Sequence, residues 1–161
     1  MTEQTRGRVR FSGAQRIQLG DDLCRVRVRL ETPANGVKVV GTAEGSASLD
    51  GQLHTAATAT LEALRQTHEG KLIKLELGEV TTFDAFGKSG VMVSLRVEHR
   101  GVPYFLTGFS QVGDASADFP ADIQVDVFRR QHVQVANVAQ AVALAVLNAT
   151  NRILGNRLFM R

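Results

Sequence analysis

The fold is decided by a short alternating stretch at residues 24–30, with the sequence CRVRVRL. Val26, Val28 and Leu30 point to one side of an extended chain, and the arginines between them point to the other. This pattern is typical of a strand with one buried face and one face in water. Such a strand requires a partner layer that covers its apolar side.

The neighbouring segments extend this strand into a larger unit. Residues 8–19 are strand-like but are broken by Gly13, which indicates a bulge or bend. A turn at 33–36 leads into a third strand at 37–41. The period then changes, because apolar residues fall on one stripe of a helix that we expect over Leu49–His68.

The second half of the chain repeats this order. The alternation of residues 26–30 recurs at residues 91–95, and a Gly-Val pair follows at the same distance in both places, at Gly36 and Gly101. The other elements expected in this half are strands over Leu72–Val80 and Val102–Phe109, with Asp84–Gly87 interrupting the sheet, and a long closing helix over His132–Leu154.

We therefore expect the α+β class, with a single domain over residues 1–161 and a pseudo-repeat of 8–70 and 71–155. Each half is predicted to be a βββα unit. The two units are expected to form one mostly antiparallel sheet with both helices on one face. Residues Gly113–Phe128 leave two alternatives open, a loop or a loop followed by a short strand at Ile123, Val125 and Val127.

Composition limits the function. A hydrophobic content of 43% supports a buried core. The one cysteine, Cys24, permits no intramolecular disulfide and fits a reducing compartment, so we expect a cytoplasmic protein.

Residues 1–10 lack the apolar core of a secretory signal. Residues 133–151 carry no charge, but five Asn and Gln side chains among them argue against a membrane span, so no membrane partner is expected.

Catalytic, metal and cofactor sites are not predicted. The four histidines have no recognised ligand spacing, and Gly87-Lys88-Ser89 lacks the earlier glycine of a phosphate-binding loop because that position is Thr82. One enzyme alternative remains. Asp50 and His54 lie one turn apart at the start of the first helix, where acyl thioesterases of the hot-dog type place acid or base groups.

A row of arginines offers a second alternative. Arg25, Arg27 and Arg29 share one face of their strand, and Arg8 and Arg10 can continue the row on a neighbouring strand. Such a row can bind the phosphates of a nucleic acid. Nucleic acid is nevertheless disfavoured, since the chain has no tryptophan and one tyrosine with which to stack bases.

The closing helix predicts a subunit contact. A helix on the surface of a monomer normally has one face rich in charge, but residues 133–151 have none in any direction. Leu144, Leu147 and Asn148 fall on the flank that a sheet would leave open. We expect this flank to form a homodimer or a higher oligomer. The alternative is that Gly113–Phe128 folds over it within one chain.

Most of the chain resembles a known regulatory domain. The matching motifs are Gly41-x-x-x-Gly45 before the first helix, the turn VTTFDAFG at residues 80–87, the alternation at 91–95 with Gly101 and Tyr104, and the end of the closing helix with Asn148 and Asn151-Arg152. These features are similar to the C-terminal regulatory (dimerisation) domain of 2-isopropylmalate synthases and citramalate synthases. The resemblance implies two βββα units, pairing with a second copy, and binding of an end-product amino acid near the dimer contact.

Carried over by this resemblance, the expected ligand-binding residues are Gly45, Ser46, Ser48, Asp50, Thr82, Asp84 and Gly87. Synthase activity is not expected, because the catalytic barrel of those enzymes has no counterpart in these residues. We therefore expect a non-enzymatic homodimeric module that binds an amino acid or another small carboxylate, mediates assembly, or does both.

Overall fold

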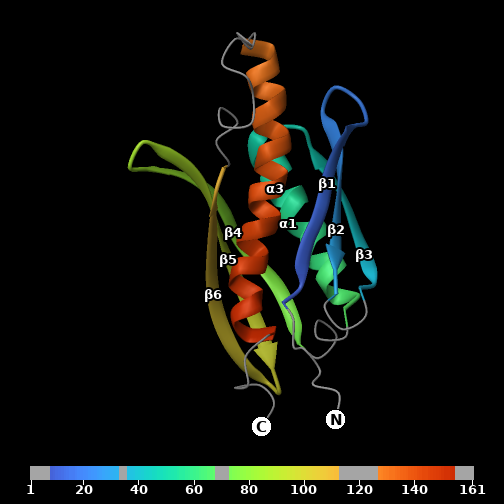
Figure 1. Cartoon of the computed structure of the whole chain (residues 1–161), viewed down its shortest axis with the longest axis vertical. Helices are drawn as coiled ribbons and strands as arrows, with labels where there is room; N and C mark the ends of the chain where they lie inside the picture. Colours follow the sequence, from blue (N-terminus) through green and yellow to red (C-terminus); the bar gives the residue numbers. More distant parts are fainter. Residues whose placement is uncertain (1–7, 33–35, 68–72, 113–126, 155–161) are drawn as a thin grey trace.

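The computed structural model describes residues 8–32, 36–67, 73–112 and 127–154, with the side chains of the last helix described over 138–151. Within these residues the order βββα occurs twice (Figure 1). The elements are β1 (Arg10–Gln18), β2 (Leu23–Glu31), β3 (Lys38–Ser46), α1 (Leu49–Arg65), β4 (Lys74–Ala85), β5 (Lys88–His99), β6 (Val102–Gln111) and α3 (Val127–Leu154).

The strands form two sheets. β1, β2 and β3 pair antiparallel in that order as the N-terminal sheet, and β4, β5 and β6 pair likewise as the C-terminal sheet. The α+β class and the two βββα units are confirmed. The expectation of one sheet with both helices on one face is wrong, because the helices form a middle layer between the two sheets (Figure 1).

Each helix also contacts the opposite unit. α1 packs on β2 and β3 and reaches β4, while α3 packs on β5 and β6 and reaches β1; the helices touch each other. The lack of charge in residues 133–151 of α3 is explained by this packing. From Val138 to Thr150 only Gln140 and Asn148 are exposed and Leu144 is half-buried. A helix that is apolar almost all round needs cover on several sides, which one sheet cannot provide. The described helices contain no stretch long and apolar enough to span a bilayer.

The two units agree in local detail. The first strand of each carries a register shift at the same place, between Phe11 and Gly13 in β1 and between Leu77 and Glu79 in β4. The register places Gly36 and Gly101 before the third strands, both with positive φ, of 65° and 77°. This correspondence allows each position in one unit to be compared with its counterpart in the other.

Each helix rests directly on the third strand of its own unit. A Cβ atom added to Gly41 in β3 would lie 1.9 Å from a carbonyl oxygen of α1, and one added to Gly108 in β6 would lie 2.1 Å from a carbonyl oxygen of α3. Glycine is needed at both positions for this close approach. The helix residues at these contacts are alanines one turn apart, Ala59 and Ala63 in α1 and Ala145 and Ala149 in α3.

Several element boundaries differ from the expected ones. β3 continues to Ser46 instead of 41, and α1 ends at Arg65. Residues 84–87 do not interrupt the sheet, because β4 continues to Ala85 and the pair Phe86-Gly87, with φ of 54° and 73°, forms a tight two-residue hairpin turn. Val127 is helical, so it is not part of a strand, whereas Ile123 and Val125 lie outside the described residues.

Candidate functional site

At the entry of α1, the serines of the predicted ligand site accept hydrogen bonds from backbone N–H groups that begin the helix. The Ser48 hydroxyl accepts a hydrogen bond of 3.1 Å from the Gly51 N–H, and the Ser46 hydroxyl accepts one of 3.2 Å from the Ser48 N–H. Gly45 packs beneath α1, and Asp50 is exposed in the first turn. The two serines therefore have a structural role in starting the helix.

The second predicted part of that site lies at the end of the β4–β5 hairpin. Asp84 is exposed, and its Oδ1 accepts a hydrogen bond of 2.6 Å from the Ser89 hydroxyl across the same hairpin. Thr82 is also exposed although its register partner is the buried Val91, so the hairpin extends beyond the helices towards the Gly87 turn (Figure 1). No hydrogen bond or ion pair joins the hairpin to the α1 entry in the part of the chain that the structure describes.

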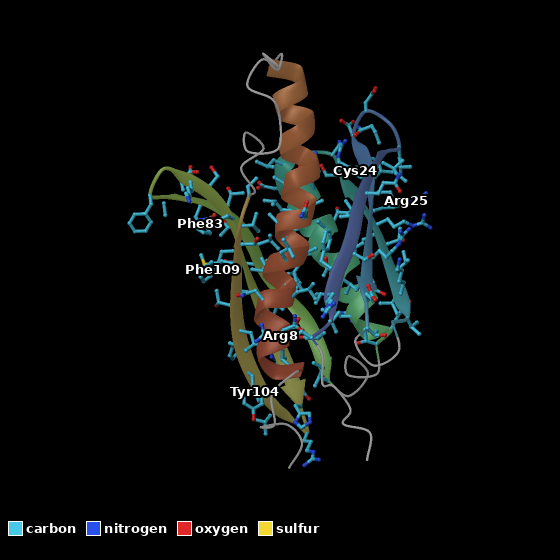
Figure 2. The ribbon with its side chains drawn as sticks, in the orientation of Figure 1. Arg8, Cys24, Arg25, Phe83, Tyr104 and Phe109 are labelled. Atoms are coloured by element: carbon cyan, nitrogen blue, oxygen red, sulfur yellow. The ribbon has the colours of Figure 1, made fainter. Side chains whose placement is uncertain are left out.

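The arginines of β2 alternate with its buried residues and so lie on the outer face of the N-terminal sheet, the face away from the helices, as Figure 2 shows for Arg25. Arg25 forms an ion pair with Glu44 of β3 at 2.6 Å, and Arg27 and Arg29 are exposed. Arg10 extends the row because it pairs with Glu31 in the register. Arg8 precedes β1 and lies beside α3, so it does not extend the row. Asp50 and His54, the pair of the enzyme alternative, are both exposed on α1.

Replacing the three arginines of β2 with glutamine is expected to leave the fold intact. Exposed ion pairs contribute about 0 to 1 kcal/mol, so the triple variant should lose less than about 1 kcal/mol of unfolding free energy. We also expect the native chain not to retard RNA or DNA in a gel at about 0.15 M salt, since Glu31 and Glu44 offset part of the positive charge. Retardation that the triple variant loses would instead establish the basic face as a nucleic-acid site.

The outer face of the C-terminal sheet is aromatic. Phe105 is 74% exposed and Phe109 is 57% exposed, with Met92 beside Phe109 in the register. The half-buried ring of Phe83 lies over Gly90, because a Cβ there would be 2.6 Å from the ring (Figure 2). These aromatic residues lie on the other sheet from the arginine row, so they are not interleaved with its arginines.

The charges of this aromatic face cancel. The positive side chains are Lys74, Lys88 and Arg96, and the negative ones are Glu76, Glu79 and Glu98, three of each sign. Glu76 forms ion pairs of 3.2 Å with both Lys74 and Arg96. Hydrogen bonds from Lys74 and then from Arg96 hold the pKa of the Glu76 carboxyl below its usual value. It is therefore ionised at neutral pH, and the face has no net charge to attract a polyphosphate.

The predicted interface residues of α3 line a hollow. It measures about 380 Å³ and lies between α3 and the start of β1, where Arg8 stands (Figure 2). The chain before and within β1 contributes Arg8, Val9 and Phe11, and α3 contributes Leu144, Leu147, Asn148 and Asn151.

Leu147 is only 4% exposed, so this leucine is covered within the chain. α3 packs against β1, β5, β6 and α1, whereas the alternative cover over Gly113–Phe128 falls largely outside the described residues. Asn151 donates a hydrogen bond of 3.2 Å from Nδ2 to the Val9 carbonyl oxygen, and its Oδ1 is buried without a partner. Sequence reasoning did not find Arg8, Val9, Phe11 and Asn151 as a group, because they meet only after the last helix packs on the first strand.

The sequence matches no protein-family model and has no significant match among curated proteins.

Proposed function

We propose that this chain is a non-enzymatic homodimeric module, and that two copies meet through the outer face of the C-terminal sheet. The observation that carries the proposal is the contrast between the two sheets. Lys38 and Thr42 on β3 hold the places that Phe105 and Phe109 hold on β6, as the shared register with β2 and β5 shows. The N-terminal sheet presents polar residues to water at positions where the C-terminal sheet presents aromatic rings. The fold itself therefore does not require the rings.

Burying these rings would stabilise a dimer. Transfer of a phenylalanine side chain out of water contributes about 1.5 to 3 kcal/mol, and each copy would contribute Phe105 and Phe109. Exposed aromatic clusters on a sheet face are typical of interaction surfaces.

A second copy fits the face better than a nucleic acid does. The face carries equal numbers of positive and negative charges, so two copies are not repelled by net charge. Three strands about 4.8 Å apart and about ten residues long at about 3.3 Å per residue give roughly 480 Å² per copy. Two such faces bury roughly 1,000 Å², which is the lower limit for a specific contact.

Two sequence features agree with this proposal. The resemblance to the regulatory domain of 2-isopropylmalate and citramalate synthases supports pairing of two copies. Cys24 is fully buried, which agrees with the reducing, cytoplasmic setting proposed from the sequence.

Light scattering tests the proposed dimer. We expect the native protein to have a mass of about 35 kDa, twice the 17.5 kDa of one chain, at about 100 μM, where a contact of about micromolar Kd is nearly saturated. Phe109→Glu should give a folded monomer, because a carboxylate would be buried without a partner at the contact. The matched control is Thr42→Glu, the counterpart position on the N-terminal sheet, which should remain dimeric. A native monomer, or a dimer that survives Phe109→Glu, contradicts the proposal.

A further inference from the structure

The β4–β5 hairpin ends in a turn that places a bulky residue in a left-handed backbone conformation. Phe86 and Gly87 are the two residues of this turn, and both have positive φ, of 54° and 73°. Such a turn strongly favours Asn-Gly, because a left-handed backbone brings the Cβ of a bulky residue close to the following carbonyl oxygen. Phenylalanine therefore destabilises the turn compared with asparagine.

The ring of Phe86 does not pack in its own chain. It is 101% exposed, more than any other large apolar side chain among the described residues. The turn is held without the ring, since the Ser89 hydroxyl donates to Asp84 and the Val112 N–H donates a hydrogen bond of 3.0 Å to the Ser89 carbonyl oxygen. Backbone strain that the fold does not need is found mostly at functional sites. The turn is therefore a candidate for contact with another molecule.

The end of the hairpin points to the side on which a second copy is proposed. Figure 1 shows that it bends away from the helices, towards the side of the outer face of the C-terminal sheet. Phe83, Met92 and Phe109 lie on that face, so the aromatic surface continues into the hairpin. The turn begins three residues beyond Phe83, or about 10 Å along the strand, and sheets packed face to face are about 10 Å apart. The tip can thus reach a facing copy.

We propose that the end of the β4–β5 hairpin is an arm that holds a second copy of this chain, with Phe86 packed on the partner. The inference rests on the proposed dimer. The flat faces alone bury roughly 1,000 Å², which is the lower limit for a specific contact. A phenylalanine buries about 150 to 250 Å², so two rings and the surface that they cover raise the total to roughly 1,600 to 2,000 Å², the size of a stable interface. Two-fold symmetry lets both arms make the same contact.

Replacing Phe86 with asparagine tests the arm, because it should change two measurements in opposite directions. In sedimentation over a dilution series, Phe86→Asn should raise the dimer Kd about a hundredfold, roughly tenfold for each of the two rings. In the monomeric Phe109→Glu background, the same replacement should raise the Tm by about 2 to 4 °C, because asparagine suits the turn. A side chain that only supported the fold would lower the Tm when replaced.

The control is Leu19→Asn. Leu19 is 39% exposed at the end of the β1–β2 hairpin, the corresponding place in the N-terminal sheet, so this variant should keep the native dimer Kd. A dimer that Phe109→Glu separates but that Phe86→Asn leaves at the native Kd overturns the arm alone. A native monomer overturns the proposed dimer and the arm together. A lower Tm for Phe86→Asn in the Phe109→Glu background means that the ring is covered within its own chain, which also overturns the arm.

Discussion

Replacing Gly41 or Gly108 with alanine is expected to remove about 3 kcal/mol of unfolding free energy at either site. The new Cβ would lie 1.9 Å or 2.1 Å from a backbone carbonyl oxygen of the helix that rests on the strand. A side chain could rotate away from such a contact, but a backbone oxygen moves only if the whole helix shifts. The helix is held by the other sheet on its far side, so overpacking costs should reach or exceed their usual upper range of about 3 kcal/mol.

Chemical denaturation measures this effect, and heating should lower the Tm by roughly 6 to 12 °C for a chain of this size. Gly13→Ala is the matched control, because nothing lies within 4 Å of a Cβ at that strand position. It should change the unfolding free energy by less than about 0.5 kcal/mol. If Gly41→Ala and Gly13→Ala are equally stable, the helix does not rest on β3 as described.

Replacing Leu147 with glutamate is expected to prevent folding. The side chain is 4% exposed and belongs to the main core, so the new carboxylate would lose its hydration among apolar side chains. The penalty is several kcal/mol on top of the lost packing, which is comparable with the total stability of about 5 to 15 kcal/mol of a typical domain. Circular dichroism and solubility should both show an unfolded chain.

Leu144→Glu is the control for this variant. Leu144 lies one turn of α3 away and is half-buried at the edge of the hollow, so its carboxylate can reach water. We expect this variant to fold and to remain dimeric. A folded Leu147→Glu protein, or a Leu144→Glu protein that becomes monomeric, would indicate that the subunit contact lies on the flank of α3.

The sequence predicted the helices and strands better than it predicted which elements pack against them. The alternation at residues 24–30 identified β2 and its buried face correctly, since side chains of a strand alternate regardless of what packs on them. It could not show whether the strands form one sheet or two, because a strand with one buried face has the same sequence pattern in either arrangement. The uncharged stretch in α3 likewise indicated burial, but the burial is within the chain and on several sides.

The candidate sites were harder to predict for two physical reasons. Both faces of β6 are apolar in sequence, so the alternation could not show that Phe105 and Phe109 face water while Leu106 faces the helix. Arg8 resembled a continuation of the arginine row, but the chain enters β1 only at Arg10 and Arg8 lies by α3 instead. Such a position depends on contacts between residues more than 130 positions apart, which local patterns do not carry.

The contact of each helix with the opposite unit has a consequence for the order of events during synthesis. β1 is the first described element to leave the ribosome, and α3, which covers it, is the last. Until α3 emerges, the inner side of β1 lacks the helix that packs against it, and the hollow beside Phe11 lacks the side that α3 forms. The first βββα unit is therefore not a stable intermediate with its own finished core, and its apolar surface stays open to chaperones for the time needed to translate roughly one hundred further residues.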